Sequence, residues 1–207
     1  AGAAYVIFGN RTAFSNISLG ALRPADGFKI VGEAGFDLAG ESVSGVGDVN
    51  GDGIDDLVVG AVGNGEGGRG AGSAYVIFGK RTARSKIFLS SLGPDDGFKL
   101  VGESGSRAGS SVTSVGDING DGIDDLFVGA DGLDEGANAT GGAYVVFGKR
   151  TKSSKIFLGT LGPDEGFSFV GEGLEDFAGR AISSAGDVNG DGFDDLIIGA
   201  YANGEGG

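Results

Sequence analysis

The chain of 207 residues is 40% apolar, so it is long enough and apolar enough to bury a hydrophobic core. Asp and Glu number 29 against 15 Lys and Arg, and the resulting formal charge of -14 would repel a phosphate backbone, which excludes nucleic acid as an expected partner. The absence of Cys and His excludes disulfides, thiolate chemistry and histidine acid–base catalysis, and no apolar run approaches the ~20 residues that a membrane-spanning helix needs.

Three motifs recur along the chain at the same spacing. The tyrosine of AYVIFG or AYVVFG stands at positions 5, 75 and 144, and the first aspartate of stretches such as GDVNGDGIDDLVVGA stands at 48, 117 and 187. The phenylalanine of DGFKIVGE and its variants stands at 28, 98 and 167, so successive copies of all three motifs are 69 or 70 residues apart. Internal repeats of this length, rich in glycine at fixed offsets, indicate a repeat fold with tight turns and closely packed strands.

Within one unit the predicted elements follow each other as short strands. Residues 41–48 alternate small and branched side chains, which is typical of an innermost strand that other backbones approach closely. Residues 56–61 and 73–79 are apolar on both faces, as central strands should be. Residues 86–92 form either a short extra strand or a packed loop, and residues 97–103 form a fourth strand.

This pattern predicts an all-β fold of β-propeller blades, each with about four antiparallel strands. A small sheet that is apolar on both faces must bury both against neighbouring sheets, which is what a blade does. The alternative is a β-solenoid, whose coils are usually much shorter than 69 residues, so the repeat length favours three blades.

The acidic stretch of each unit is a candidate metal-binding loop between two strands. In the first copy, positions 1, 3, 5 and 9 are Asp48, Asn50, Asp52 and Asp56, position 7 offers the carbonyl of Ile54, and intervening glycines let the chain curl. Calcium takes six to eight oxygen ligands of these kinds, whereas magnesium demands a stricter octahedron and is the second choice. The plain alternative is a polar turn without an ion, but such a turn has no use for four carboxylates in three copies.

A helical EF-hand is excluded because its position 12 needs a bidentate Glu, and the three copies have Val59, Val128 and Ile198 there. The second aspartate of each adjacent pair is the predicted ligand. The first aspartates are expected to face solvent: Asp55, Asp124 and Asp194.

With these motifs the chain resembles, over essentially its whole length, the FG-GAP repeat of integrin alpha-subunit propellers and of many bacterial surface proteins. In that family a D-x-[DN]-x-D-G-x-x-D hairpin loop binds calcium, so the resemblance implies three Ca²⁺ sites. It implies that the second site consists of Asp117, Asn119, Asp121, the Ile123 carbonyl and Asp125, and the third of Asp187, Asn189, Asp191, the Phe193 carbonyl and Asp195.

The chain departs from the family pattern outside the loops. The aromatic residue of the FG element is present as Phe177, but Leu38 and Arg107 replace it in the other copies. The GAP element lacks its proline and reads Gly60-Ala61-Val62, Gly129-Ala130-Asp131 and Gly199-Ala200-Tyr201. These departures concern packing between elements rather than the acidic loops.

The whole chain, 1–207, is expected to be one repeat array. Residues 1–35 form the latter half of a blade, 36–104 and 105–174 are repeats, and 175–207 form the first half of a blade that residues 1–9 of another copy could complete. Either the array is part of a longer one, or copies exchange strands into a six-bladed dimer or a head-to-tail filament.

The resemblance implies a non-catalytic, calcium-binding propeller module that is secreted or displayed on a cell surface. Its expected role is extracellular adhesion, binding or structural assembly, with a protein or glycan as partner. The alternative is a propeller-fold hydrolase or lyase acting on an extracellular polymer, although no nucleophile–base pair is recognisable. The basic clusters at 80–84 and 149–152 are expected to be solvated turns that offset the acidic loops.

Overall fold

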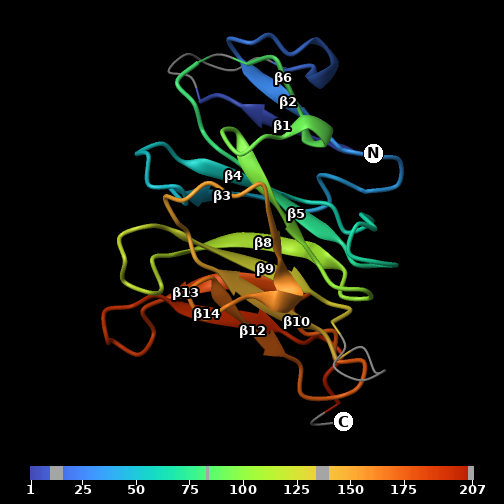
Figure 1. Ribbon diagram of the computed structural model, residues 1–207, viewed down its shortest axis with the longest axis vertical. Coiled ribbons are helices and arrows are strands. Elements are labelled where there is room, and N and C mark those ends of the chain that lie inside the picture. Colours follow the sequence, from blue (N-terminus) through green and yellow to red (C-terminus); the bar gives the residue numbers. More distant parts are fainter. Residues whose placement is uncertain (10–15, 83, 134–139, 205–207) are drawn as a thin grey trace.

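The structure is a computed structural model that describes residues 1–9, 16–82, 84–133 and 140–204, and these residues form an all-β fold (Figure 1). Over these described residues the helical segments are three single 3-10 turns, and none of them is long enough to cross a membrane. The turns are η1 (Leu19–Ala21), η2 (Leu89–Ser91) and η3 (Leu158–Thr160). The strands are β1 (Ala3–Ile7), β2 (Gly27–Val31), β3 (Val43–Gly47), β4 (Asp56–Gly60), β5 (Ser73–Ile77), β6 (Lys86–Phe88), β7 (Gly97–Val101), β8 (Ala108–Gly116), β9 (Asp125–Ala130), β10 (Gly142–Val146), β11 (Lys155–Phe157), β12 (Gly166–Val170), β13 (Ala181–Gly186) and β14 (Asp195–Gly199).

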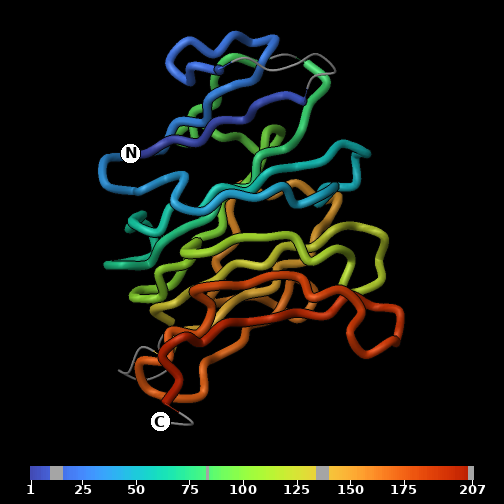
Figure 2. Tube along the Cα trace, turned by 180° about the vertical axis from the view of Figure 1, so that it is seen from behind, coloured from blue at the N-terminus to red at the C-terminus, as the bar shows by residue number. Residues whose placement is uncertain are grey.

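The strands form small sheets that follow one another from the N-terminal to the C-terminal end of the molecule (Figures 1 and 2). Two sheets have four antiparallel strands each, in the orders β3-β4-β5-β7 and β8-β9-β10-β12. Strands β1 and β2 form an antiparallel pair at one end, and β13 and β14 form one at the other. The predicted all-β fold built from propeller blades is confirmed.

The short strands β6 and β11 link neighbouring sheets. Each follows the third strand of its own sheet but runs parallel to the outer strand of the preceding one, β6 beside β2 and β11 beside β7. Their central residues, Ile87 and Ile156, are buried. From the sequence, residues 86–92 were expected to be either a short strand or a packed loop. The structure shows a three-residue strand followed by a 3-10 turn.

The central strands carry the core, as their sequences predict. Every residue of β5, β9 and β10 is buried, because neighbouring sheets cover both faces of these strands. Phe127, Tyr75 and Tyr144 are among the largest side chains that are fully buried. The core therefore lies between the sheets, and it fixes how one sheet faces the next.

The ends of β4 and β9 lie where the backbones of neighbouring sheets come close together. A Cβ atom on Gly60 would lie 2.2 Å from the carbonyl oxygen of Gly109, and one on Gly129 would lie 2.0 Å from that of Gly179. No side chain fits at such distances, so the glycine of each GAP element is required by the approach of the next sheet. The crowding lies on the second strands of the two sheets; on β3 a Cβ atom at Gly45 would meet nothing within 4 Å, so a close backbone approach to residues 41–48 stays a prediction.

In the second repeat the departures from the FG and GAP elements compensate one another. Leu38, Arg107 and Phe177 occupy the same position and all have a left-handed backbone, with φ angles of 58°, 55° and 51°. Arg107 Nε pairs with Asp131 Oδ1 at 2.9 Å, whereas Phe177 stacks on Tyr201 with ring centroids 5.5 Å apart. One pair of positions is thus filled by an ion pair in one repeat and by two stacked rings in the next.

Candidate metal centre

The three acidic stretches form the hairpin loops between β3 and β4, β8 and β9, and β13 and β14. They project on the same side of the stack of sheets (Figures 1 and 2). A register shift at the end of each hairpin accompanies the loop, since Gly47, Gly116 and Gly186 pair with the first residue of the returning strand. We refer to them as the first, second and third acidic loops: residues 48–56, 117–125 and 187–195.

The aspartate at position 1 holds each loop closed around its own carboxylate. In the first loop, Asp48 Oδ1 accepts a hydrogen bond from the amide of Asp52 at 2.9 Å, and Oδ2 accepts one from Gly53 at 2.7 Å. The second loop repeats the arrangement at 2.9 Å and 2.7 Å, and Asp187 in the third loop accepts amide hydrogen bonds in the same way. Left-handed glycines, such as Gly51 and Gly53 with φ of 71° and 81°, make this curl possible.

The aspartate at position 9 lies under the loop and ties it to the rest of the sheet. Asp56 is fully buried and accepts hydrogen bonds from the amides of Val49 at 3.2 Å and Gly79 at 2.8 Å. Asp125 is equally buried and accepts them from the equivalent amides at 3.0 Å and 2.8 Å. Asp195 in the third loop is half-buried and accepts one from Val188 at 2.8 Å.

The carboxylates of one loop act on one another electrostatically. Burial raises the pKa of Asp56 to about 7; the amide hydrogen bond from Gly79 opposes the rise, and the charges of Asp52 and Asp48 add to it. Burial likewise raises the pKa of Asp125 to about 6, with smaller contributions from the negative charges of its own loop. A nearby divalent cation would favour the ionised carboxylates instead.

The donor chemistry of the loops suits a hard cation. Each loop offers carboxylate, amide and backbone carbonyl oxygens and no nitrogen or sulfur ligand, which is the set that calcium prefers. Within the described ranges, no Lys or Arg side chain pairs with a carboxylate at position 1, 5 or 9 of any loop. The residues present therefore fit a calcium ion.

The structure places the predicted ligands of each site in one loop, but their carboxylates do not converge on a common centre. Among the residues that the structure describes, no three carboxylates are gathered closely enough to hold a metal ion as they stand. Loop amides engage several of the oxygens: Asn119 Oδ1 and Asn189 Oδ1, for example, each accept a hydrogen bond from the aspartate two residues later. The predicted carbonyl ligands of Ile54, Ile123 and Phe193 stay predictions.

Residues of the sheet β8-β9-β10-β12 support the first acidic loop, which contradicts one expectation from the sequence. Asp124 was expected to face solvent, but its Oδ2 accepts a hydrogen bond from the amide of Asp48 at 2.8 Å. The cluster at 149–152 was expected to be a solvated turn that offsets the acidic loops. Arg150, Thr151 and Lys152 are exposed, and Arg150 Nη1 donates to the carbonyl of Gly51 at 2.7 Å, while the amide of Lys149 donates to that of Val49 at 3.0 Å. Asp55 is exposed, as expected.

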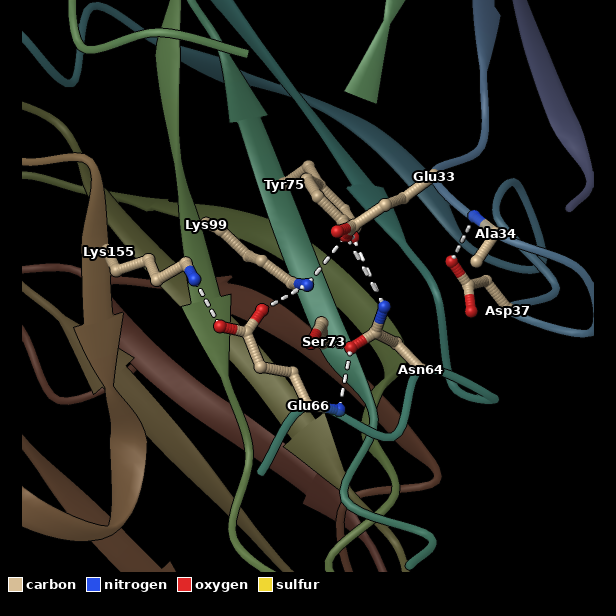
Figure 3. Close-up of polar contacts among 9 residues, drawn as sticks. All are labelled: Glu33, Ala34, Asp37, Asn64, Glu66, Ser73, Tyr75, Lys99 and Lys155. Atoms are coloured by element: carbon tan, nitrogen blue, oxygen red, sulfur yellow. Dashed lines mark hydrogen bonds and ion pairs between the residues drawn. The ribbon is translucent and has the colours of Figure 1, made fainter. Parts of the chain in front are cut away.

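A second polar cluster, between the first two sheets, was not singled out from the sequence (Figure 3). Lys99 on β7 is buried and donates from Nζ to Glu33 at 2.7 Å and to Glu66 at 2.6 Å. Tyr75 on β5 donates its hydroxyl to Glu33, and Lys155 on β11 pairs with Glu66. The recurrence of the tyrosine and of the lysine in GFK was the signal in the sequence that could have revealed it.

The charges of this cluster stabilise one another. Burial opposes ionisation of Glu33, but hydrogen bonds from Lys99 and Tyr75 outweigh it and hold the pKa of Glu33 below its ordinary value. Hydrogen bonds from Lys155 and Lys99 lower the pKa of Glu66. Burial and the bond to Glu33 raise the pKa of Tyr75, so that its hydroxyl stays a neutral donor.

Comparison with known proteins places these loops in a family context. Residues 39–77, 108–146 and 178–207 match the FG-GAP repeat. The chain is 33% identical over 160 residues to integrin alpha-PS5 of Drosophila melanogaster and 31% identical over 186 residues to integrin alpha-5 of Xenopus laevis, alignments that cover 74% and 84% of the chain. It is 36% identical over 160 residues, 74% of the chain, to phosphatidylinositol-glycan-specific phospholipase D of Bos taurus. The chain spans 14%, 16% and 17% of the lengths of these three relatives.

Proposed function

The chain belongs to the FG-GAP repeat family, and from this premise we propose that it is a non-catalytic, calcium-binding β-propeller module for extracellular adhesion, binding or structural assembly. The observation that carries the proposal is the recurrence of one acidic hairpin loop in three successive sheets, with its first aspartate holding the loop and its last one lying beneath it. When bound, calcium supplies the positive charge that offsets the clustered carboxylates and joins the two ends of each loop.

Three calcium sites follow from this proposal, one in each acidic loop. Each would use the side chains at positions 1, 3, 5 and 9 and the carbonyl at position 7. The proposed ligands are Asp48, Asn50, Asp52, Ile54 and Asp56; Asp117, Asn119, Asp121, Ile123 and Asp125; and Asp187, Asn189, Asp191, Phe193 and Asp195.

We propose an extracellular or cell-surface location and a protein or glycan as the partner. The similarity to integrin alpha chains supports both the location and the kind of partner. Both are proposed only for the segment that the alignments cover. The similarity to phosphatidylinositol-glycan-specific phospholipase D favours an enzymatic alternative, a hydrolase acting on an extracellular substrate. We prefer the non-catalytic function because the chain contains no His and no Cys for general base or nucleophilic catalysis.

Calcium is expected to raise the melting temperature of the protein by roughly 2 to 15 °C over its value in chelator. Sites with dissociation constants of ~0.1 to 1 mM, at ~1 mM calcium, would each stabilise the fold by about 0.4 to 1.4 kcal/mol. Three sites would contribute about 1 to 4 kcal/mol, and each kcal/mol shifts the melting temperature of a domain of this size by roughly 2 to 4 °C. The measurement is thermal unfolding followed by circular dichroism at neutral pH.

The control is a variant in which Asp52, Asp121 and Asp191 are all replaced by Asn. An amide keeps the oxygen that accepts the hydrogen bond from the residue two positions later, but it removes the charge that calcium needs. The calcium-dependent shift should therefore shrink while the fold in chelator persists. Identical melting curves of the natural protein in calcium and in chelator would contradict the proposal.

We further propose that, where the array is not continued by further repeats of the same chain, copies associate by strand exchange. In the described part of the chain, β1 and β2 form the outer half of a sheet, and β13 and β14 form the inner half of another. In the complete sheet Val59 on β4 pairs with Tyr75 on β5, and the equivalent contact would join Ile198 of one copy to Tyr5 of the next. Light scattering should show a dimer or a larger polymer, whereas a strict monomer at high concentration would rule out strand exchange.

A further inference from the structure

Asp124, at position 8 of the second acidic loop, holds the first residue of the first acidic loop. Its Oδ2 accepts a hydrogen bond from the amide of Asp48 at 2.8 Å, and its own amide donates to the carbonyl of Asp48 at 3.4 Å. One residue therefore engages the backbone on both sides of Asp48. Because Asp48 is the proposed ligand at position 1, the contact that fixes its backbone also restricts its carboxylate.

Two further hydrogen bonds join the first acidic loop to the same neighbouring sheet. The amide of Lys149 donates to the carbonyl of Val49 at 3.0 Å, and Arg150 Nη1 donates to the carbonyl of Gly51 at 2.7 Å. Val49, at position 2, is 1% exposed, whereas Val188 at the same position of the third loop is 74% exposed. The following repeat thus orders the first loop through contacts that need no cation.

The glycine that precedes each of the first two loops leaves room for this approach. Gly47 and Gly116 have left-handed φ angles of 69° and 66°. A Cβ atom on Gly47 would collide with the carboxylate of Asp124, and one on Gly116 would lie 2.8 Å from Asp194 Oδ2. In the second and third loops, the first aspartate of the adjacent pair therefore approaches the loop of the preceding repeat.

The same segment of chain carries a proposed ligand of the second calcium site. Asp125 follows Asp124 directly and occupies position 9 of the second loop, where it accepts amide hydrogen bonds from Ile118 at 3.0 Å and Gly148 at 2.8 Å. Adjacent residues of an extended chain point to opposite sides, so Asp125 serves its own loop while Asp124 reaches the preceding one. Whatever restrains Asp125 therefore also restrains the backbone that places Asp124.

We propose that Asp124 is a positioning residue for the first calcium site and that it couples this site to the second one. The inference rests on the proposed calcium-binding function. Asp124 limits the conformational freedom of Asp48, so less of that freedom is lost when the first site is filled. Filling the second site restrains Asp125 and strengthens this hold. Because coupling between two binding sites is reciprocal, filling the first site also strengthens binding at the second.

The test is a titration of the ¹⁵N-labelled, chelator-treated protein with calcium chloride. The amides of Gly53, Gly122 and Gly192 report the three sites separately, because each donates to the carboxylate at position 1 of its own loop. Asp124→Ala should weaken calcium binding at Gly53 by about fivefold or more and leave binding at Gly192 within about twofold. Asp124→Asn keeps an acceptor oxygen and should stay within about twofold of the natural protein at Gly53.

Substitution of one ligand in another loop tests the coupling without changing Asp124. Asp121→Asn removes a carboxylate from the second site and should weaken binding at Gly53 by about threefold to tenfold. The matched control is Asp191→Asn, the same substitution in the third loop, which should change the response of Gly53 by less than about twofold. In a protein that also carries Asp124→Ala, the effect of Asp121→Asn on Gly53 should disappear.

A measurement in chelator separates this inference from the calcium-binding function. The amide of Asp48 should exchange with deuterium at least about tenfold faster in Asp124→Ala than in the natural protein, because it loses its acceptor. An unchanged exchange rate would overturn the positioning role of Asp124.

The calcium titration distinguishes the remaining outcomes. Glycine signals that calcium does not move would overturn the calcium-binding function, and with it the effect of Asp124 on calcium affinity. If calcium moved the signals of Gly53, Gly122 and Gly192, but neither Asp124→Ala nor Asp121→Asn changed the midpoint at Gly53, the calcium-binding function would stand and the inference would be overturned. Equal effects of Asp121→Asn and Asp191→Asn on Gly53 would also overturn it.

Discussion

Replacing Asp56 with alanine is expected to lower the free energy of unfolding by about 2 to 4 kcal/mol, whereas replacing the adjacent Asp55 should change it by less than about 0.5 kcal/mol. Asp56 is fully buried and accepts hydrogen bonds from the amides of Val49 and Gly79. Alanine leaves both donors without their acceptor in a place that water does not reach. Asp55 is exposed, so its loss removes only a solvated charge.

The two variants form a matched pair because they remove the same side chain at neighbouring positions. Urea unfolding followed by circular dichroism in chelator measures the structural contribution alone, and repeating it in calcium measures the contribution of the cation. Asp56→Asn, which keeps one acceptor oxygen, should lose roughly half as much stability as Asp56→Ala in chelator. Equal losses for Asp55→Ala and Asp56→Ala would contradict the assignment of Asp56 as the residue that anchors the loop.

Replacing Lys99 with methionine is expected to cost about 1 to 3 kcal/mol of unfolding free energy, between the effects of exposed and of buried ion pairs. Lys99 is the common cation of Glu33 and Glu66, and methionine fills much of the same space without the charge. Lys29→Met is the matched control: Lys29 lies over the ring of Tyr5 and makes no ion pair with the described residues. Its effect should stay below about 1 kcal/mol.

The cost of the Lys99→Met substitution should depend on pH in a defined direction. The pKa values of Glu33 and Glu66 are held below their ordinary value in the folded protein, so their contribution to stability is present above that value and is lost as the pH falls through the lowered values. The difference between the natural protein and the variant should thus be largest near neutral pH and should shrink below about pH 4. A difference that stays constant from pH 7 to pH 3 would show that packing, and not charge, accounts for the loss.

The sequence predicts the repeat and the four long strands of a sheet because both depend on local patterns. Runs such as residues 56–61, which are apolar on both faces, can bury both faces only between two sheets, and the structure places them there. The hairpin position of the acidic loops follows from the strands on either side. What these loops bind rests on residue chemistry, and for this reason the calcium sites stay a proposal.

The contacts between repeats could not be predicted from the sequence. Strand β11 is three residues long and pairs with β7 of the preceding sheet, a partner that no local periodicity indicates. Asp124 was assigned to solvent because the second aspartate of the pair, Asp125, was the predicted ligand, but the neighbouring loop supplies the amide of Asp48 to the Asp124 carboxylate. The Arg107–Asp131 pair looked like two separate departures from the family pattern until the fold brought both side chains together. In each case the missing information is which surface of one sheet faces the next.

The most direct test of the calcium-binding loops is a crystal structure of the protein grown in millimolar calcium, with anomalous diffraction data collected to locate the ion. The expected result is one anomalous peak in each of the three acidic loops, surrounded by oxygen atoms at about 2.3 to 2.6 Å. Loops without such a peak, in which Asp48, Asp117 and Asp187 bind only their own backbone amides, would contradict it.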